Sequence, residues 1–170
     1  WVGGVILAAV LIPALTAAFE LTPKVYPPKE TTADALDKIN EVIDAVNGEN
    51  VLFIDQRQLL TFGDVPKIPL IADYEKKWMM DEAMADNADW FAPYLADLKA
   101  HRFTVIISEP LQIKFQGAEL NFSEENDLFV KHVSIPTLCT YEPIETFPDQ
   151  GVQILVQRAE PVTFDGVTCP

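Results

Sequence analysis

The chain has 170 residues, the length of one ordinary domain or of one domain with an appendage. Hydrophobic residues make up 49% of it and charged residues 22%, so it can form a packed core and wholesale disorder is excluded. Twelve basic against 26 acidic residues give a formal net charge of −14. This charge argues against binding to nucleic acid or to anionic lipid, because both need clustered Lys and Arg.

Residues 1–19 contain no charged side chain. As a helix, a run of this length spans roughly 28 Å, close to the hydrocarbon thickness of a bilayer. Gly4 and Ala8 are small enough to let another helix approach closely. We therefore expect a transmembrane helix that packs against other membrane helices or like subunits, in a homo-oligomer or a larger complex.

Two alternatives stay open for this run: a pilin-like helix in a filament core, and a buried helix of the domain itself. A signal peptide fits poorly, because a basic n-region and an A-x-A cleavage site are missing. The first residue is Trp1 rather than Met, which indicates a processed product or an internal residue of a longer protein.

Residues 20–30 form a Pro-rich neck, and residues 31–170 are expected to form one domain. The acidic excess and the lack of a basic cluster after residue 19 disfavour the cytoplasmic side, so we expect a periplasmic or cell-surface domain. Cys139 and Cys169 predict a disulfide in such a compartment, with two buried free thiols as the alternative.

Apolar residues of the polar region recur at the spacings of alternating helices and strands. The predicted elements are a helix from Thr31 or Thr32 to Val46, a buried strand at 51–54, irregular chain at 58–72, helices over 73–87 and from Asp89, a buried strand at 104–108, a helix over 124–130 ended by Pro136, strands at 138–143 and 151–158, and a loop over 144–150. The two buried strands are expected to be parallel neighbours. The predicted fold class is thus α/β, with a hydrophobic helix before a small Rossmann-like domain that ends in a strand pair.

Asp55 and Glu109 follow the ends of the two expected parallel strands, where open α/β sheets bind ligands. Two carboxylates there suit general acid/base catalysis or cation binding, so these residues are the catalytic candidates, although weak ones. In the structural alternative, Asp55 caps the next turn and Glu109 opens an X-Pro turn. Arg57 is expected to pair with either carboxylate.

No other motif points to chemistry or to a cofactor. A G-x-G-x-x-G pattern is missing after the first strand, so a dinucleotide site is not supported. His101 and His132 lie in no metal-ligand spacing and are interpreted as surface or helix-end residues, so no metal site is expected. Ser108 lacks the G-x-S-x-G context of a nucleophile elbow.

The region around the second helix has an ordinary structural interpretation. Trp78, Met79 and Met84 are expected in the core rather than in a binding groove. The acidic stretches at 81–89 and 124–127 are interpreted as solvated helix faces, because a calcium loop needs the tighter D-x-D-x-D-G pattern.

Three segments carry a resemblance to a known family: NVLFIDQRQLLTFG, FTVIISEP and CTYEPIETFPDQGVQILVQR. Together with the preceding hydrophobic helix and neck, they resemble the extracytoplasmic C-terminal region of bacterial polytopic membrane proteins related to glycosyltransferases that use polyprenyl-phosphate sugars. The resemblance covers most of residues 1–158. In that family the catalytic acids lie between early membrane helices, so the resemblance implies a non-catalytic domain and assigns no active-site residue here.

We therefore expect a membrane-anchored extracytoplasmic interaction subunit that assembles through residues 1–19 and has no enzymatic activity by itself. One alternative is the non-catalytic soluble domain of a membrane glycosyltransferase. Another is a pilin-like filament subunit, although no acidic residue precedes Glu20 where pilins have a glutamate. A free-standing α/β enzyme using Asp55 and Glu109 would need both carboxylates within about 10 Å.

Overall fold

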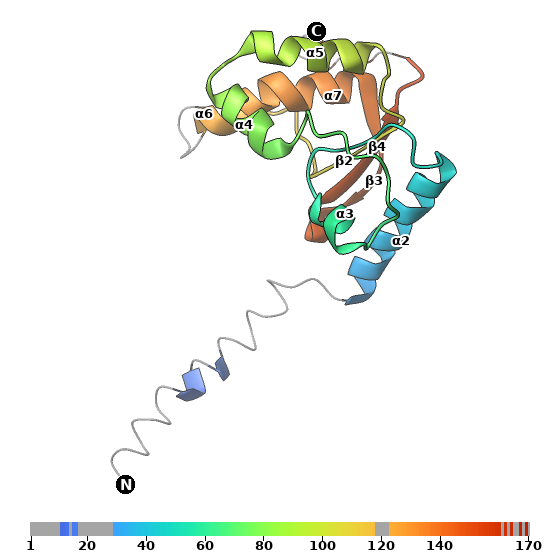
Figure 1. Ribbon diagram of the computed structural model, residues 1–170. Coiled ribbons are helices and arrows are strands. Elements are labelled where there is room, and N and C mark those ends of the chain that lie inside the picture. Colours follow the sequence, from blue (N-terminus) through green and yellow to red (C-terminus); the bar gives the residue numbers. More distant parts are fainter. Residues whose placement is uncertain are drawn as a thin grey trace.

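Helices flank one four-stranded sheet in the computed structural model (Figure 1). The described residues are 11–13, 15–16, 29–117, 123–160, 162, 164, 167 and 169. Most of the expected membrane helix, with Gly4 and Ala8, lies outside this part of the chain, as does the neck up to residue 28. No helix among the described residues is both long and apolar enough to cross a membrane.

One helix precedes the first strand and three helices separate it from the second, whereas in the last third three helical segments precede two strands. In chain order, the elements are α2 (Lys29–Ala45), β1 (Val51–Phe53), α3 (Gln58–Phe62), α4 (Lys76–Met84), α5 (Ala88–Lys99), β2 (Val105–Ser108), α6 (Ser123–Phe129), the π-helix η1 (Val130–Ser134), α7 (Ile135–Thr140), β3 (Tyr141–Phe147), the 3-10 turn η2 (Pro148–Gln150) and β4 (Val152–Gln157).

The sheet is mixed, with strand order β1-β2-β4-β3. β1 and β2 run parallel, with Val51 opposite Val105. β4 pairs antiparallel with β2 on one side and with β3 on the other. The predicted α/β class, parallel pair and C-terminal strand pair are therefore confirmed.

Successive strand residues face opposite layers of helices, which explains the apolar runs in the sequence. Val51 and Phe53 pack in the cluster that includes residues of α2 and α3, whereas Leu52 and Ile54 pack in the cluster that includes residues of α4 to α7. Figure 1 shows these two groups of helices on different sides of the sheet. Because both faces of the sheet are covered, every residue of β1 and β2 is buried. A strand of this kind needs apolar side chains on both faces rather than an alternating pattern.

Two buried tyrosines join separate elements: Tyr94 joins two helices, and Tyr141 joins β3 to the segment before β2. The Tyr94 hydroxyl of α5 lies 2.7 Å from Thr137 Oγ1 of α7. The Tyr141 hydroxyl donates to the carbonyl of Phe103 at 3.0 Å and accepts from the Phe103 amide at 3.2 Å. These partners satisfy hydroxyl groups that would otherwise be costly to bury.

Three sequence predictions about the last third are wrong. Pro136 does not end a helix, since α6, η1 and α7 follow one another without a break and Pro136 lies in the first turn of α7. The π-helix widens the backbone just before that turn. Residues 138–140 are therefore helical, and the strand begins at Tyr141.

The predicted loop over 144–150 belongs largely to β3, which extends to Phe147. Pairing with β4 stabilises this segment, and an irregularity between Pro143 and Glu145 shifts the register. β3 is an edge strand, where a proline without a backbone N–H is tolerated.

The region between the two parallel strands also differs from the predictions. Trp78 and Met84 are 55% and 53% exposed rather than in the core, because α4 buries a narrow face that contains Met79 and Ala83. The expected irregular stretch contains α3. Asn87, and not Asp89, caps α5 by accepting a hydrogen bond from the amide of Trp90.

Candidate functional site

The carboxylates of Asp55 and Glu109 meet at one lysine. The Lys76 ammonium nitrogen lies 3.4 Å from Asp55 Oδ2 and 2.5 Å from Glu109 Oε2. Asp55 follows β1 and Glu109 follows β2, and these parallel neighbours end at the same edge of the sheet. The two candidate carboxylates therefore lie well within the about 10 Å that acid/base partners need.

The start of α4 places Lys76 at this edge. Its backbone amide donates to the carbonyl of Ile54 at 2.8 Å, which docks the helix on the end of β1. Burial acts to lower the pKa of Lys76, but the hydrogen bond to Glu109 and the charges of Glu109 and Asp55 outweigh it and raise that pKa. The amine is thus held as a cation and is unsuited to act as a nucleophile or a base.

Asp55 also shapes the turn after β1. Its Oδ1 accepts the Gln56 amide at 2.7 Å, while Gln56 adopts a left-handed backbone with φ of 60°. The Gln56 side chain in turn donates to the carbonyl of Gly151 at 3.2 Å. Asp55 therefore uses Oδ1 for the turn and Oδ2 for Lys76. The structural alternative, in which Asp55 caps the turn, explains the position of Oδ1 but not the contact of Oδ2 with Lys76.

Arg57 contacts neither of the two carboxylates, so the predicted pairing is wrong. Its guanidinium donates to the carbonyls of Phe53 and Ile71 at 2.9 and 3.0 Å and lies 3.4 Å from Glu75 Oε2. Burial lowers the pKa of Arg57, against the charge of Glu75. Arg57 thus joins the end of β1 to the segment before α4.

Two hollows adjoin the Lys76–Glu109 pair, one through each residue. The larger cavity, of about 550 Å³, has Lys76 in its lining, and the smaller, of about 200 Å³, has Glu109. The larger cavity is lined by three acids and three bases, namely Asp55, Glu75, Asp81, Arg57, Lys76 and Lys77. These six formal charges sum to zero, so the lining has no net charge.

The two histidines have different surroundings. His101 is exposed and follows the end of α5, as predicted. The prediction is wrong for His132, which is buried, stacks on Phe91 and places Nε2 2.6 Å from Asp86 Oδ1. Hydrogen bonds from Lys131 and His132 lower the pKa of Asp86. These contacts join the turn before α5 to η1.

No three His, Cys, Asp or Glu side chains in the described part of the chain are grouped so that they could hold a metal ion. Ser108 is buried, and its hydroxyl donates to the carbonyl of Glu109. This arrangement provides no exposed nucleophile at the end of β2.

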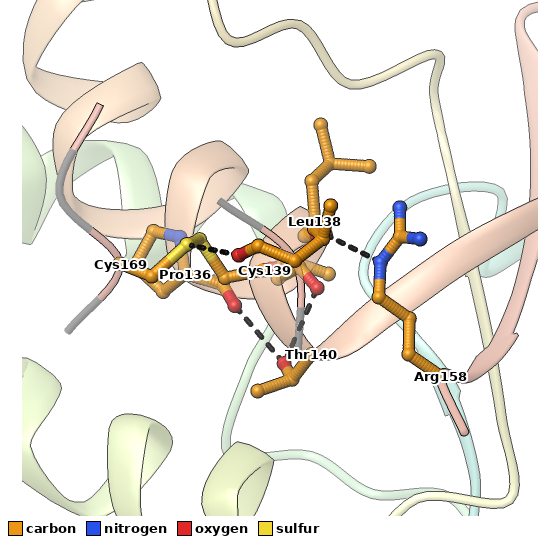
Figure 2. The surroundings of a disulfide bond; sticks show 8 residues. Pro136, Leu138, Cys139, Thr140, Arg158 and Cys169 are labelled. Atoms are coloured by element: carbon orange, nitrogen blue, oxygen red, sulfur yellow. Dashed lines mark hydrogen bonds between the residues drawn. A yellow bond between two sulfur atoms is a disulfide. The ribbon is translucent and has the colours of Figure 1, made fainter. Parts of the chain in front are cut away.

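The predicted disulfide between Cys139 and Cys169 is confirmed, with a Cα–Cα distance of 5.8 Å (Figure 2). Cys139 is buried in α7, and Cys169 is half-buried. Arg158 donates from Nε to the carbonyl of Leu138 at 2.9 Å and so caps the end of α7 beside the bridge (Figure 2).

Sequence reasoning missed Lys76, Arg158 and the pairing of His132 with Asp86. Only the position of Lys76 in the first turn of the helix predicted over 73–87 offered a signal, since a basic residue there opposes the helix dipole and so needs acidic partners. The partners of Arg158 and His132 lie 20 and 46 residues away in the sequence, beyond any local pattern.

Comparison with protein-family models, with curated protein sequences and with solved structures finds no match to this chain.

Proposed function

We propose that this chain is a membrane-tethered extracytoplasmic interaction subunit. In this proposal, residues 1–19 assemble it with other membrane helices or with like subunits, and the α/β domain contacts protein partners rather than transforming a substrate. The uncharged N-terminal run and the acidic domain that follows support this arrangement.

The observation that carries the proposal is the Cys139–Cys169 disulfide. Disulfides persist in oxidising compartments such as the periplasm or the cell surface and are rare in the cytosol. A domain with such a bridge, joined by a short neck to a run long and apolar enough to span a bilayer, fits an extracytoplasmic location on a membrane anchor.

The carboxyl edge of the parallel strands supports an interaction role over catalysis. Both candidate carboxylates contact Lys76, and its ammonium group is held in the charged state. General acid/base catalysis needs a group that exchanges a proton with the substrate, and an ion pair that already occupies both carboxylates opposes such exchange.

A second candidate function is the non-catalytic soluble domain of a membrane glycosyltransferase. The observation that favours it is the placement of the resembling segments: two contain the parallel strands β1 and β2, and the third contains β3 and β4. All four strands of the sheet thus belong to the segments that carry the resemblance. In this candidate function too, the domain binds other protein and carries out no catalysis, which takes place in a separate membrane region.

Assembly of the membrane-extracted full chain tests the first proposal. In the helix that the sequence predicts, Gly4 and Ala8 share one face and Val10 lies on another. Gly4→Leu and Ala8→Leu should shift the chain to smaller species on native gels, because larger side chains prevent close helix approach. Val10→Leu is the control and should leave assembly unchanged. Unchanged assembly in all three variants would contradict the proposal.

A further inference from the structure

We propose that the larger cavity at the carboxyl edge of the sheet binds a free α-amino acid with an apolar side chain. The carboxylate of the ligand pairs with Lys77, its ammonium group pairs with Asp81, and its side chain packs on Met80; all three residues line the cavity. The ligand is a small molecule, so this site does not depend on what residues 1–19 assemble with.

The cavity lies where the two layers of helices part. Its lining comes from the end of β1, the start of α3 and the first two turns of α4. Leu59 and Leu60 of α3 pack in one core cluster, whereas Met79 and Ala83 of α4 pack in the other. Open α/β sheets bind ligands in such a crevice outside the carboxyl ends of their strands. Its volume of about 550 Å³ is in the range of small-molecule sites.

Four of the six charged groups in the lining are paired with each other. The Lys76 ammonium nitrogen lies 3.4 Å from Asp55 Oδ2. The Arg57 guanidinium lies 3.4 Å from Glu75 Oε2. A ligand charge that displaced either pair would leave one of its members unpaired, which is costly for groups withdrawn in part from water. The charges of the ligand therefore have to meet the other two groups.

Lys77 and Asp81 are those two groups, and their charges have opposite signs. Neither forms an ion pair with another residue that the structure describes. Both are exposed, so a ligand can reach them from solvent. Four residues apart in α4, they lie on one face of the helix, one turn from each other. A ligand with a single charge is attracted by one group and repelled by the other, whereas a zwitterion pairs with both.

The apolar part of the lining determines which amino acids fit. It consists of Ile54, which follows β1 and is buried, and of Met80, which is half-buried on α4 and packs against the core. A methionine side chain is unbranched and polarisable, so it adapts to apolar groups of different shape. The site therefore favours apolar side chains over polar ones and accepts more than one of them.

Isothermal titration calorimetry of the membrane-extracted full chain with L-leucine and L-methionine tests the site. We expect both amino acids to bind with dissociation constants below about 1 mM. Isocaproate and isoamylamine each keep the side chain and one charge of leucine, and both should bind at least about tenfold more weakly than L-leucine. Dissociation constants above this limit for both amino acids, or an analogue that binds as tightly as L-leucine, would overturn the proposal.

Two variants assign the two charges. Asp81→Asn should weaken L-leucine binding at least about tenfold and remove the preference for L-leucine over isocaproate. Lys77→Met should weaken it as much and remove the preference over isoamylamine. Both residues are exposed, so neither substitution should unfold the domain, which circular dichroism checks. Asp37→Asn on α2 and Lys99→Met on α5 are the matched controls, because both residues are exposed and outside the cavity lining, and they should leave the affinity unchanged. Unchanged affinity in Asp81→Asn and Lys77→Met would refute the site.

Discussion

The parallel half of the domain, from α2 to β2, and the C-terminal third, from α6 to β4, are stabilised in different ways. In the first, the two strands are buried on both faces between layers of apolar helix residues. In the second, specific bonds join distant residues: the disulfide, the Tyr141 hydroxyl on the Phe103 backbone, and Arg158 on the end of α7.

This difference explains where local pattern succeeds. In the parallel half, hydrophobic periodicity and final packing agree for α2, β1 and β2, so these three elements can be recognised from neighbours in the sequence. In the C-terminal third, contacts between distant segments override the local signal of Pro136 and extend β3 beyond Pro143. The parallel half and the C-terminal third should therefore respond differently to substitution.

The largest effect is expected from truncation of the core in the parallel half. Ile106 is fully buried in β2, so Ile106→Ala should lower the free energy of unfolding by about 4 kcal/mol, through lost apolar transfer and the cavity left behind. Ile144 in the edge strand β3 is 46% exposed, and Ile144→Ala should change it by less than about 0.5 kcal/mol. Urea unfolding of both variants measures the contrast, and equal losses would refute it.

A smaller effect is expected at alkaline pH from the C-terminal third. Burial raises the pKa of Tyr141 from 10.0 to about 12. The folded state thus holds the phenolic proton of Tyr141 more tightly than the unfolded chain does. The protonated Tyr141 therefore contributes its full share of the free energy of unfolding below pH 10, and this contribution is lost as the pH rises to about 12. The loss should be about 2–3 kcal/mol.

Thermal unfolding between pH 9 and 12 measures this loss. Tyr141→Phe should lose less stability over that range than the parent chain. At pH 9 the variant should already be less stable than the parent, because the Phe103 backbone loses its hydrogen-bond partner. An equal alkaline loss in both chains would show that other groups, such as Tyr74 with its raised pKa beside Asp97, dominate.

The smallest effect is expected at the carboxyl edge. Lys76→Met should lower stability by about 1 kcal/mol, because the two ion pairs that it removes are about one-third exposed and solvent screens them. Lys77 lines the same cavity but makes no ion pair in the described structure. Lys77→Met is therefore the control and should leave the free energy of unfolding unchanged. A loss of several kcal/mol in Lys76→Met would show that ionic contacts, rather than apolar burial, stabilise the parallel half.

The candidate site could be predicted in part. Asp55 and Glu109 were placed at the ends of adjacent strands because parallel strands end at one edge. Their shared contact with Lys76 could not be predicted, because Lys76 lies 21 residues after Asp55 and the docking of α4 depends on the path of the intervening segment, which contains α3. The sequence also predicts the wrong partner for Arg57, because Ile71 and Glu75, which it contacts, belong to the same intervening segment.

The sequence by itself determined the two buried strands, their parallel pairing, the helix before them and the pairing of the two cysteines. The helix and the strands follow from local hydrophobic runs. Their parallel pairing follows from the general rule for strands joined by a helical crossover, and the cysteine pairing from the presence of two cysteines alone in the sequence. Only the tertiary structure decided the continuous helix through Pro136, the length of β3, the burial of His132 and the partners of Lys76 and Arg57. Each depends on contacts between residues far apart in the chain, and their energies exceed the weak local preferences that the sequence displays.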